Sequence, residues 1–94
     1  MAMRSPKWFV LAALVALSPE TPGVFELWDN DELVYVRATG DKQTLRTELA
    51  RELAAHVTDA THFSWEITYQ PERRERQLLD EFEHQYHRRP RFNS

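Results

Sequence analysis

The 94-residue chain contains no cysteine, only two glycines and no excess of positive charge. The lack of cysteine excludes disulfides, cysteine-ligated zinc sites and thiol catalysis. Two glycines are too few for a glycine-rich phosphate-binding loop. A formal net charge of −3 argues against a strongly basic nucleic-acid-binding protein and leaves room only for a local basic patch. With 41% hydrophobic and 12% aromatic residues, the chain can build one globular core and has no room for two.

The amino-terminal segment has two interpretations. Arg4 and Lys7 precede an apolar run over residues 8–17, which stops before Pro19. This order is typical of a secretory leader, but a proline directly after the best cleavage site is unfavourable, and the run is too short to span a membrane. We therefore predict that residues 1–18 form a short apolar helix, with a cleaved leader as the alternative. The absence of cysteine favours a cytoplasmic location without a membrane partner.

The remainder of the chain, residues 19–94, predicts one α+β domain. In chain order, the expected elements are strands at 24–28 and 33–37, a helix at 44–57, a strand at 63–69 and a helix that begins at Pro71. The polar residues 29–32 between the first two strands favour a tight antiparallel hairpin. The order predicts a three-stranded antiparallel sheet flanked by helices, with the extra helix at the amino terminus.

The third expected strand has the clearest periodicity in the chain, because apolar and polar residues alternate along it. The apolar set is Phe63, Trp65, Ile67 and Tyr69, and the polar set is Ser64, Glu66 and Thr68. Alternation with a period of two predicts one face toward the core and one toward water. We expect the apolar set to pack against the helical residues Leu49, Leu53, Leu79 and Phe82.

Three short motifs stand in a particular order around these elements. Gly23–Phe25 opens the hairpin, Tyr35–Val36 lies on its second strand, and Pro90–Asn93 follows the last helix. In this arrangement, the chain from Gly23 to Asn93 resembles the GIY-YIG nuclease superfamily. The resemblance implies metal-assisted hydrolysis of a nucleic-acid phosphodiester, with Mg²⁺ or Mn²⁺ as the cofactor and a nucleic acid, DNA first, as the partner.

The resemblance also implies roles for individual residues. Glu75 matches the metal-binding glutamate, because Glu75–Leu79 reproduces the family's Glu-x-x-apolar-apolar helix start. Tyr35 matches the second-strand tyrosine and Asn93 the closing asparagine, while Arg37 stands where the family has glycine. These four residues are the candidate catalytic set. From the residues alone, Glu75 is equally well explained as a first-turn acid favoured by the helix dipole. Asn93 is better explained by local hydrogen bonds of a turn, and Tyr35 by packing with its hydroxyl satisfied.

Three departures from the family pattern argue against efficient hydrolysis. Phe25 replaces the first-strand tyrosine and cannot relay a proton. Arg37 replaces the glycine, and Glu48 places an anion where the family has an arginine. Loss of a cation beside a phosphate removes transition-state stabilisation. We therefore predict a degenerate nuclease that acts in nucleic-acid binding or processing, with a non-catalytic protein-interaction module as the alternative.

Phosphate contacts are expected from arginines outside these motifs. Arg46 and Arg51 are the candidates to substitute for the missing helix arginine, although both project from other faces of that helix. The densest basic patch, near the carboxyl terminus, contains Arg88, Arg89 and Arg91. His84 and His87 are spaced as a metal-binding pair would be, but without further ligands we interpret them as a solvated helix end.

Overall fold

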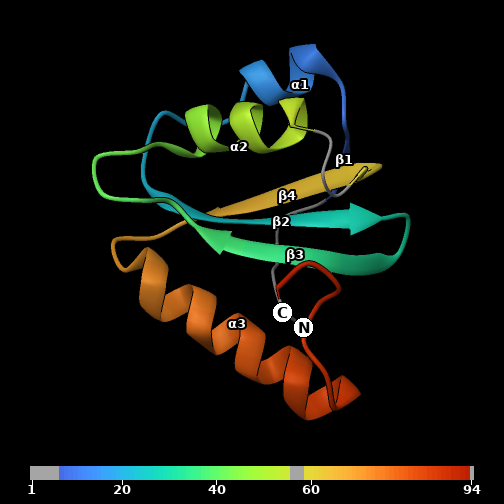
Figure 1. Cartoon of the computed structure of the whole chain (residues 1–94). Coiled ribbons are helices and arrows are strands. Elements are labelled where there is room, and N and C mark those ends of the chain that lie inside the picture. Colours follow the sequence, from blue (N-terminus) through green and yellow to red (C-terminus); the bar gives the residue numbers. More distant parts are fainter. Residues whose placement is uncertain (1–6, 56–58, 94) are drawn as a thin grey trace.

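The computed structural model describes residues 7–55 and 59–93. Its elements, in chain order, are β1 (Trp8–Phe9), α1 (Ala12–Ala16), β2 (Gly23–Asp29), β3 (Glu32–Ala38), α2 (Leu45–Ala54), β4 (His62–Ile67) and α3 (Pro71–Tyr86). Helices α1 and α2 cover one face of the sheet and α3 covers the other (Figure 1). The α+β class and the antiparallel sheet flanked by helices are thus confirmed. Within the described ranges, no helix is long and apolar enough to cross a membrane.

The sheet has four strands in the order β1-β4-β2-β3, and every neighbouring pair is antiparallel. The hairpin between β2 and β3 turns at Asn30, which adopts a φ of 54°, a conformation that asparagine tolerates. The hairpin also contains a bulge, because Leu27 pairs with Tyr35 and Trp28 pairs with Leu33, so Val34 is the extra residue. Gly23 at the start of β2 is required by packing, since a Cβ there would lie 2.3 Å from the Glu66 carbonyl oxygen.

Local signals mark the start of α2 and both ends of α3. Thr44 caps α2 with its side chain, which accepts a hydrogen bond from the Thr47 backbone N–H. Pro71 begins α3, and His87 ends it in the left-handed conformation with a φ of 60°. Helix α2 ends at Ala54, and the last predicted turn of that helix extends into residues 56–58, which lie outside the described residues.

The prediction of a three-stranded sheet is wrong because residues 8–17 do not form one helix. Trp8 and Phe9 pair with Phe63 and His62 as an additional edge strand, and α1 begins only at Ala12. The Trp8 ring packs edge-on against Phe63 and Trp65, with centroid distances of 5.8 and 5.3 Å. Strand pairing and aromatic contact together outweigh the helical preference of an apolar run. The structure does not describe the first six residues.

The sheet is buried on both faces, which corrects the expected orientation of β4. Phe63 belongs to the core under α1 and α2, whereas Phe82 belongs to the core under α3, so the two do not pack together as predicted. Leu79 also lies on the α3 side. Ser64, expected to face water, is buried beneath α3, and the strand ends at Ile67, which is exposed. Tyr69 is fully exposed rather than buried.

Candidate functional site

The outer edge of β3 is covered by the carboxyl-terminal segment. The Asn93 side chain accepts a hydrogen bond from Val36 N–H at 2.8 Å and donates one to Val36 C=O at 2.8 Å. The Phe92 N–H donates to the Val34 carbonyl at 2.9 Å. Asn93 therefore takes the place of a neighbouring strand, which prevents an exposed edge from pairing with other chains.

Glu75 covers the same edge of β3 two residues beyond Val36, at Ala38. Its Oε2 accepts a hydrogen bond from Ala38 N–H at 3.0 Å. The predicted metal ligand and the predicted terminal asparagine thus lie along one strand edge, where each satisfies backbone groups. Among the described residues, no group of three or more His, Cys, Asp and Glu side chains is placed to hold a metal ion. Glu75 is a single carboxylate with one oxygen engaged by the backbone, so Mg²⁺ bound there would take its other ligands from water and phosphate.

The predicted tyrosine and arginine form a pair with each other. The Tyr35 hydroxyl oxygen accepts a hydrogen bond from Arg37 Nη1 at 3.0 Å. Burial raises the pKa of Tyr35 above its usual value, so the phenol stays protonated and is unsuited to be a general base. Phe25, at the first-strand tyrosine position, is buried in the core with its ring centroid 6.3 Å from that of Tyr35.

A cleft of about 510 Å³ lies between the end of β3 and the first half of α3, and we call it the β3–α3 cleft. Charged side chains of both signs line it: Arg37, Glu48, Glu72, Glu75, Arg76, Asp80 and Arg89. Two of its carboxylates are already engaged, since Glu48 pairs with Arg51 and Glu75 accepts from the backbone. A neighbouring depression shares Arg76 with this cleft and adds Lys42, Arg73 and the exposed ring of Tyr69.

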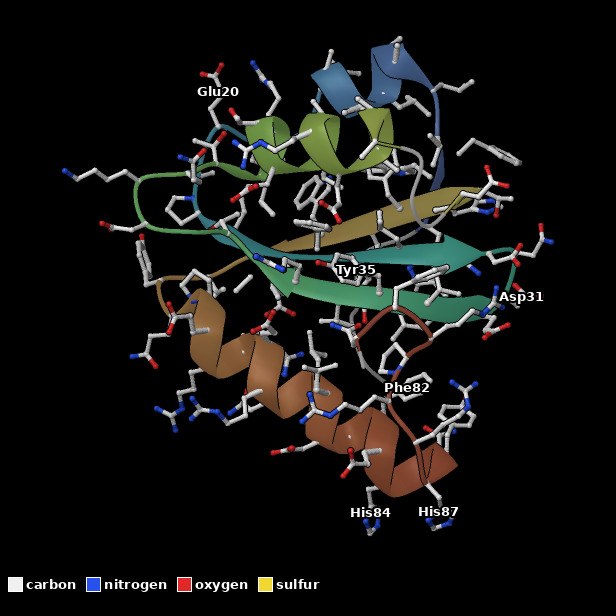
Figure 2. The ribbon with its side chains drawn as sticks, viewed as in Figure 1. Glu20, Asp31, Tyr35, Phe82, His84 and His87 are labelled. Atoms are coloured by element: carbon white, nitrogen blue, oxygen red, sulfur yellow. The ribbon has the colours of Figure 1, made fainter. Side chains whose placement is uncertain are left out.

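The four arginines predicted to contact nucleic acid do not form one patch. Arg46 pairs with Glu20 beside α2, whereas Arg88 and Arg91 pair with Glu32 of the β2–β3 hairpin. Figure 2 shows Glu20 on the α2 side of the sheet, away from α3. Arg89 alone of the four lines the β3–α3 cleft, and it pairs with Glu83.

Arg37 and Arg76 differ from the four arginines described above. Within residues 7–55 and 59–93, neither Arg37 nor Arg76 forms an ion pair with a carboxylate, and both line the β3–α3 cleft. Arg37 was expected at the site, but Arg76 was not. Its position next to Glu75 in the α3 sequence is the signal that could have indicated it. His84 and His87 point away from the sheet at the end of α3 (Figure 2), which agrees with a solvated helix end.

A buried carboxyl group on the central strand was not predicted. Glu26 is fully buried, and its Oε1 accepts a hydrogen bond from Ser64 Oγ at 3.2 Å. Its Oε2 has no hydrogen-bond partner among the described residues. Burial raises the pKa of Glu26 from 4.5 to about 7. The sequence signal for it is the single acid inside the apolar stretch Val24–Trp28.

These features define a small α+β domain whose central strand is buried on both faces and whose edge is covered by its own carboxyl terminus. The chain belongs to the family described as Domain of unknown function (DUF7508), whose sequence model matches residues 2–85. The edge-covering residues Phe92 and Asn93 lie beyond that match. No curated protein and no solved structure matches the chain at a significant level.

Proposed function

We propose that this chain is a GIY-YIG-like domain that binds nucleic acid at the β3–α3 cleft and has lost phosphodiester hydrolysis. The order of hairpin, helix, strand and helix agrees with what the resemblance implies. Glu75 and Asn93 lie along the same strand edge, as residues of one former site would. The resemblance itself is part of the proposal.

The observation that carries the proposal is the contrast between two groups of side chains. The residues at the positions that hydrolysis needs have structural roles. Phe25 is buried in the core, the Tyr35 hydroxyl accepts a hydrogen bond from Arg37, and Glu75 accepts one from Ala38 N–H. By contrast, Arg76 and Arg37 line an open cleft without a carboxylate partner among the described residues, and only Nη1 of Arg37 is engaged, by the Tyr35 hydroxyl. Arginine presents paired N–H donors that suit a phosphate, so these two side chains can hold a backbone without cleaving it.

We expect the double variant Arg37→Gln/Arg76→Gln to bind a fluorescent 20-nucleotide DNA about tenfold more weakly than the wild type, measured by anisotropy at low salt. Loss of two phosphate contacts should also reduce the slope of log affinity against log salt by about 1.5. The matched control is Arg51→Gln/Arg91→Gln, which removes the same charge from exposed, ion-paired positions. Equal weakening by both double variants would show a nonspecific charge effect and contradict the cleft as the site.

The same protein is expected to show no robust cleavage of single-stranded, duplex or branched DNA with Mg²⁺ or Mn²⁺. Loss of a general base alone costs about 10²–10⁴-fold in rate. Phe25→Tyr should not restore cleavage, because the new hydroxyl would enter a core position that is 1% exposed and would destabilise the fold by about 1–3 kcal/mol. Strong wild-type cleavage that disappears in Glu75→Gln would overturn this part of the proposal, since glutamine can still accept from Ala38 N–H.

A protein-interaction role is the second candidate, and one observation favours it. Phe9, Leu11 and Leu17 are 64%, 56% and 74% exposed around β1 and α1. Three exposed apolar side chains within one nine-residue segment favour an interaction surface there. Oligonucleotides that fail to bind under any salt condition, together with self-association of the chain in light scattering, would support this candidate over nucleic-acid binding.

A further inference from the structure

A second cleft, of about 690 Å³, lies between the tip of the β2–β3 hairpin and the last turns of α3. Its walls are mainly apolar and include Trp28, Leu33, Phe82 and Tyr86. We call it the aromatic cleft, because three of these four side chains are aromatic. Figure 2 shows Phe82 between α3 and the sheet and Asp31 at the tip of the hairpin. The size and the apolar walls are those of a binding pocket for a side chain or small ligand.

Side-chain contacts hold the walls of the aromatic cleft in place. Trp28 Nε1 donates a hydrogen bond to Ser64 Oγ at 3.0 Å, which fixes the indole. Phe82 is 7% exposed, and its ring centroid lies 4.5 Å from that of Tyr86. Tyr86 remains 51% exposed, so its ring offers free aromatic surface beside a rigid floor. Such a site needs little rearrangement to accept a ligand.

Cations of the chain itself already lie against these aromatic rings. The Arg88 guanidinium carbon is 5.2 Å from the Phe82 centroid and 6.0 Å from that of Tyr86. On the other side, Lys7 Nζ lies 4.7 Å from the Trp28 centroid. Distances of this size are those of cation–π attraction. The walls therefore suit a cation with an apolar stem.

The charged side chains at the rim of the aromatic cleft are mainly negative, which suits a cationic ligand. Three carboxylates, Asp31, Glu32 and Glu81, line the cleft against one cation, Arg88. Glu32 pairs with Arg88 and Arg91, and Asp31 with Lys7, whereas Glu81 forms no ion pair within residues 7–55 and 59–93. A second cation entering the cleft would thus find an aromatic surface and one available carboxylate.

We propose that the aromatic cleft binds an arginine side chain presented by a partner protein, next to an apolar residue of that partner. The partner's guanidinium lies on the Tyr86 ring and pairs with Glu81, and its apolar neighbour packs on Trp28 and Leu33. Arg88 acts as a competitor within the chain, because it occupies part of the same aromatic surface and pairs with Glu32. This inference is independent of nucleic-acid binding at the β3–α3 cleft.

The test uses the full chain and a dye-labelled pentapeptide with arginine between two leucines and glycine at each end. A matched peptide carries citrulline, which keeps the shape of arginine and removes its charge. We expect the arginine peptide to bind about tenfold more tightly than the citrulline peptide by anisotropy, and Glu81→Gln or Tyr86→Ala to abolish most of that difference. Arg88→Gln is expected to strengthen binding about threefold, whereas Arg51→Gln, remote from the cleft, leaves it unchanged.

Melting curves identify variants that fail to fold, and Tyr86→Phe, which retains the ring, is expected to bind as the wild type does. Equal binding of the two peptides, or no binding at millimolar peptide, would overturn the proposal. Free arginine that competes as well as the arginine peptide would also overturn it, because the cleft would then be a small-molecule pocket rather than a protein-docking site. Weaker binding in Arg88→Gln would contradict the competitor role.

Discussion

Replacing Glu26 with glutamine is expected to change how the stability of the protein depends on pH. In the wild type, the pKa of the folded state is about 7 and that of the free side chain is 4.5, chiefly because burial disfavours the carboxylate. A raised pKa means that the folded state binds a proton more tightly than the unfolded state does. The stability associated with protonated Glu26 is therefore complete below pH 4.5 and is lost as the pH rises through 7.

The expected size of this effect follows from the shift. A rise from 4.5 to about 7 corresponds to about 3 kcal/mol. Glutamine cannot ionise, so the difference in unfolding free energy between Glu26→Gln and wild type should move by about 3 kcal/mol in favour of the variant between pH 4.5 and pH 8. A constant offset from the new amide group affects all pH values equally and does not change this slope.

The measurement is urea unfolding at five pH values from 4.5 to 8, with Asp41→Asn as the control. Asp41 is an exposed carboxylate in the loop before α2, so the control removes one negative charge without a change in the core. If the Glu26→Gln profile were parallel to that of the wild type, the carboxylate of Glu26 would be solvated in the native state. The burial of Glu26 beneath α3 would then be contradicted.

Replacing Asn93 with alanine is expected to lower the free energy of unfolding by about 2–3 kcal/mol. The side chain makes both hydrogen bonds to Val36, and alanine leaves the Val36 N–H and C=O without these partners. Each polar group left unsatisfied costs about 1–3 kcal/mol, and partial access of water to the strand edge keeps the sum toward the lower end. For a domain of this size, the melting temperature should fall by about 8 °C or more.

Two further variants separate the hydrogen bonds from the mere presence of a side chain. Asn93→Asp keeps an acceptor for Val36 N–H but sets a carboxylate against Val36 C=O, so it should also destabilise the protein, more at neutral than at acidic pH. Gln85→Ala removes an exposed amide from α3 and should change the stability by less than about 0.5 kcal/mol. If the Asn93→Ala protein had the same melting temperature as the wild type, the carboxyl-terminal segment would not stabilise the edge of β3.

Elements with local signals could be predicted from the sequence. The hairpin has a polar turn at Asn30, α2 has a capping threonine at Thr44, and α3 begins at Pro71 and ends at His87. In each case, a few adjacent residues carry the conformational preference, so no distant contact is needed to recognise it. The resemblance put Glu75 and Asn93 into one candidate set, but that both bind the outer edge of β3 came only from the structure.

The sequence by itself thus determined the class of the domain, the hairpin and both long helices, because these depend on neighbours along the chain. Only the tertiary structure decided that Trp8 joins the sheet, that helices cover both of its faces, and that Glu26 is buried. It also decided which arginines are paired within the chain and which line a cleft. Burial, ion pairing and strand addition depend on contacts between residues that are far apart in the sequence. The alternation of apolar and polar residues along a strand is the same whether its polar face meets water or a helix, so the sequence pattern does not distinguish the two.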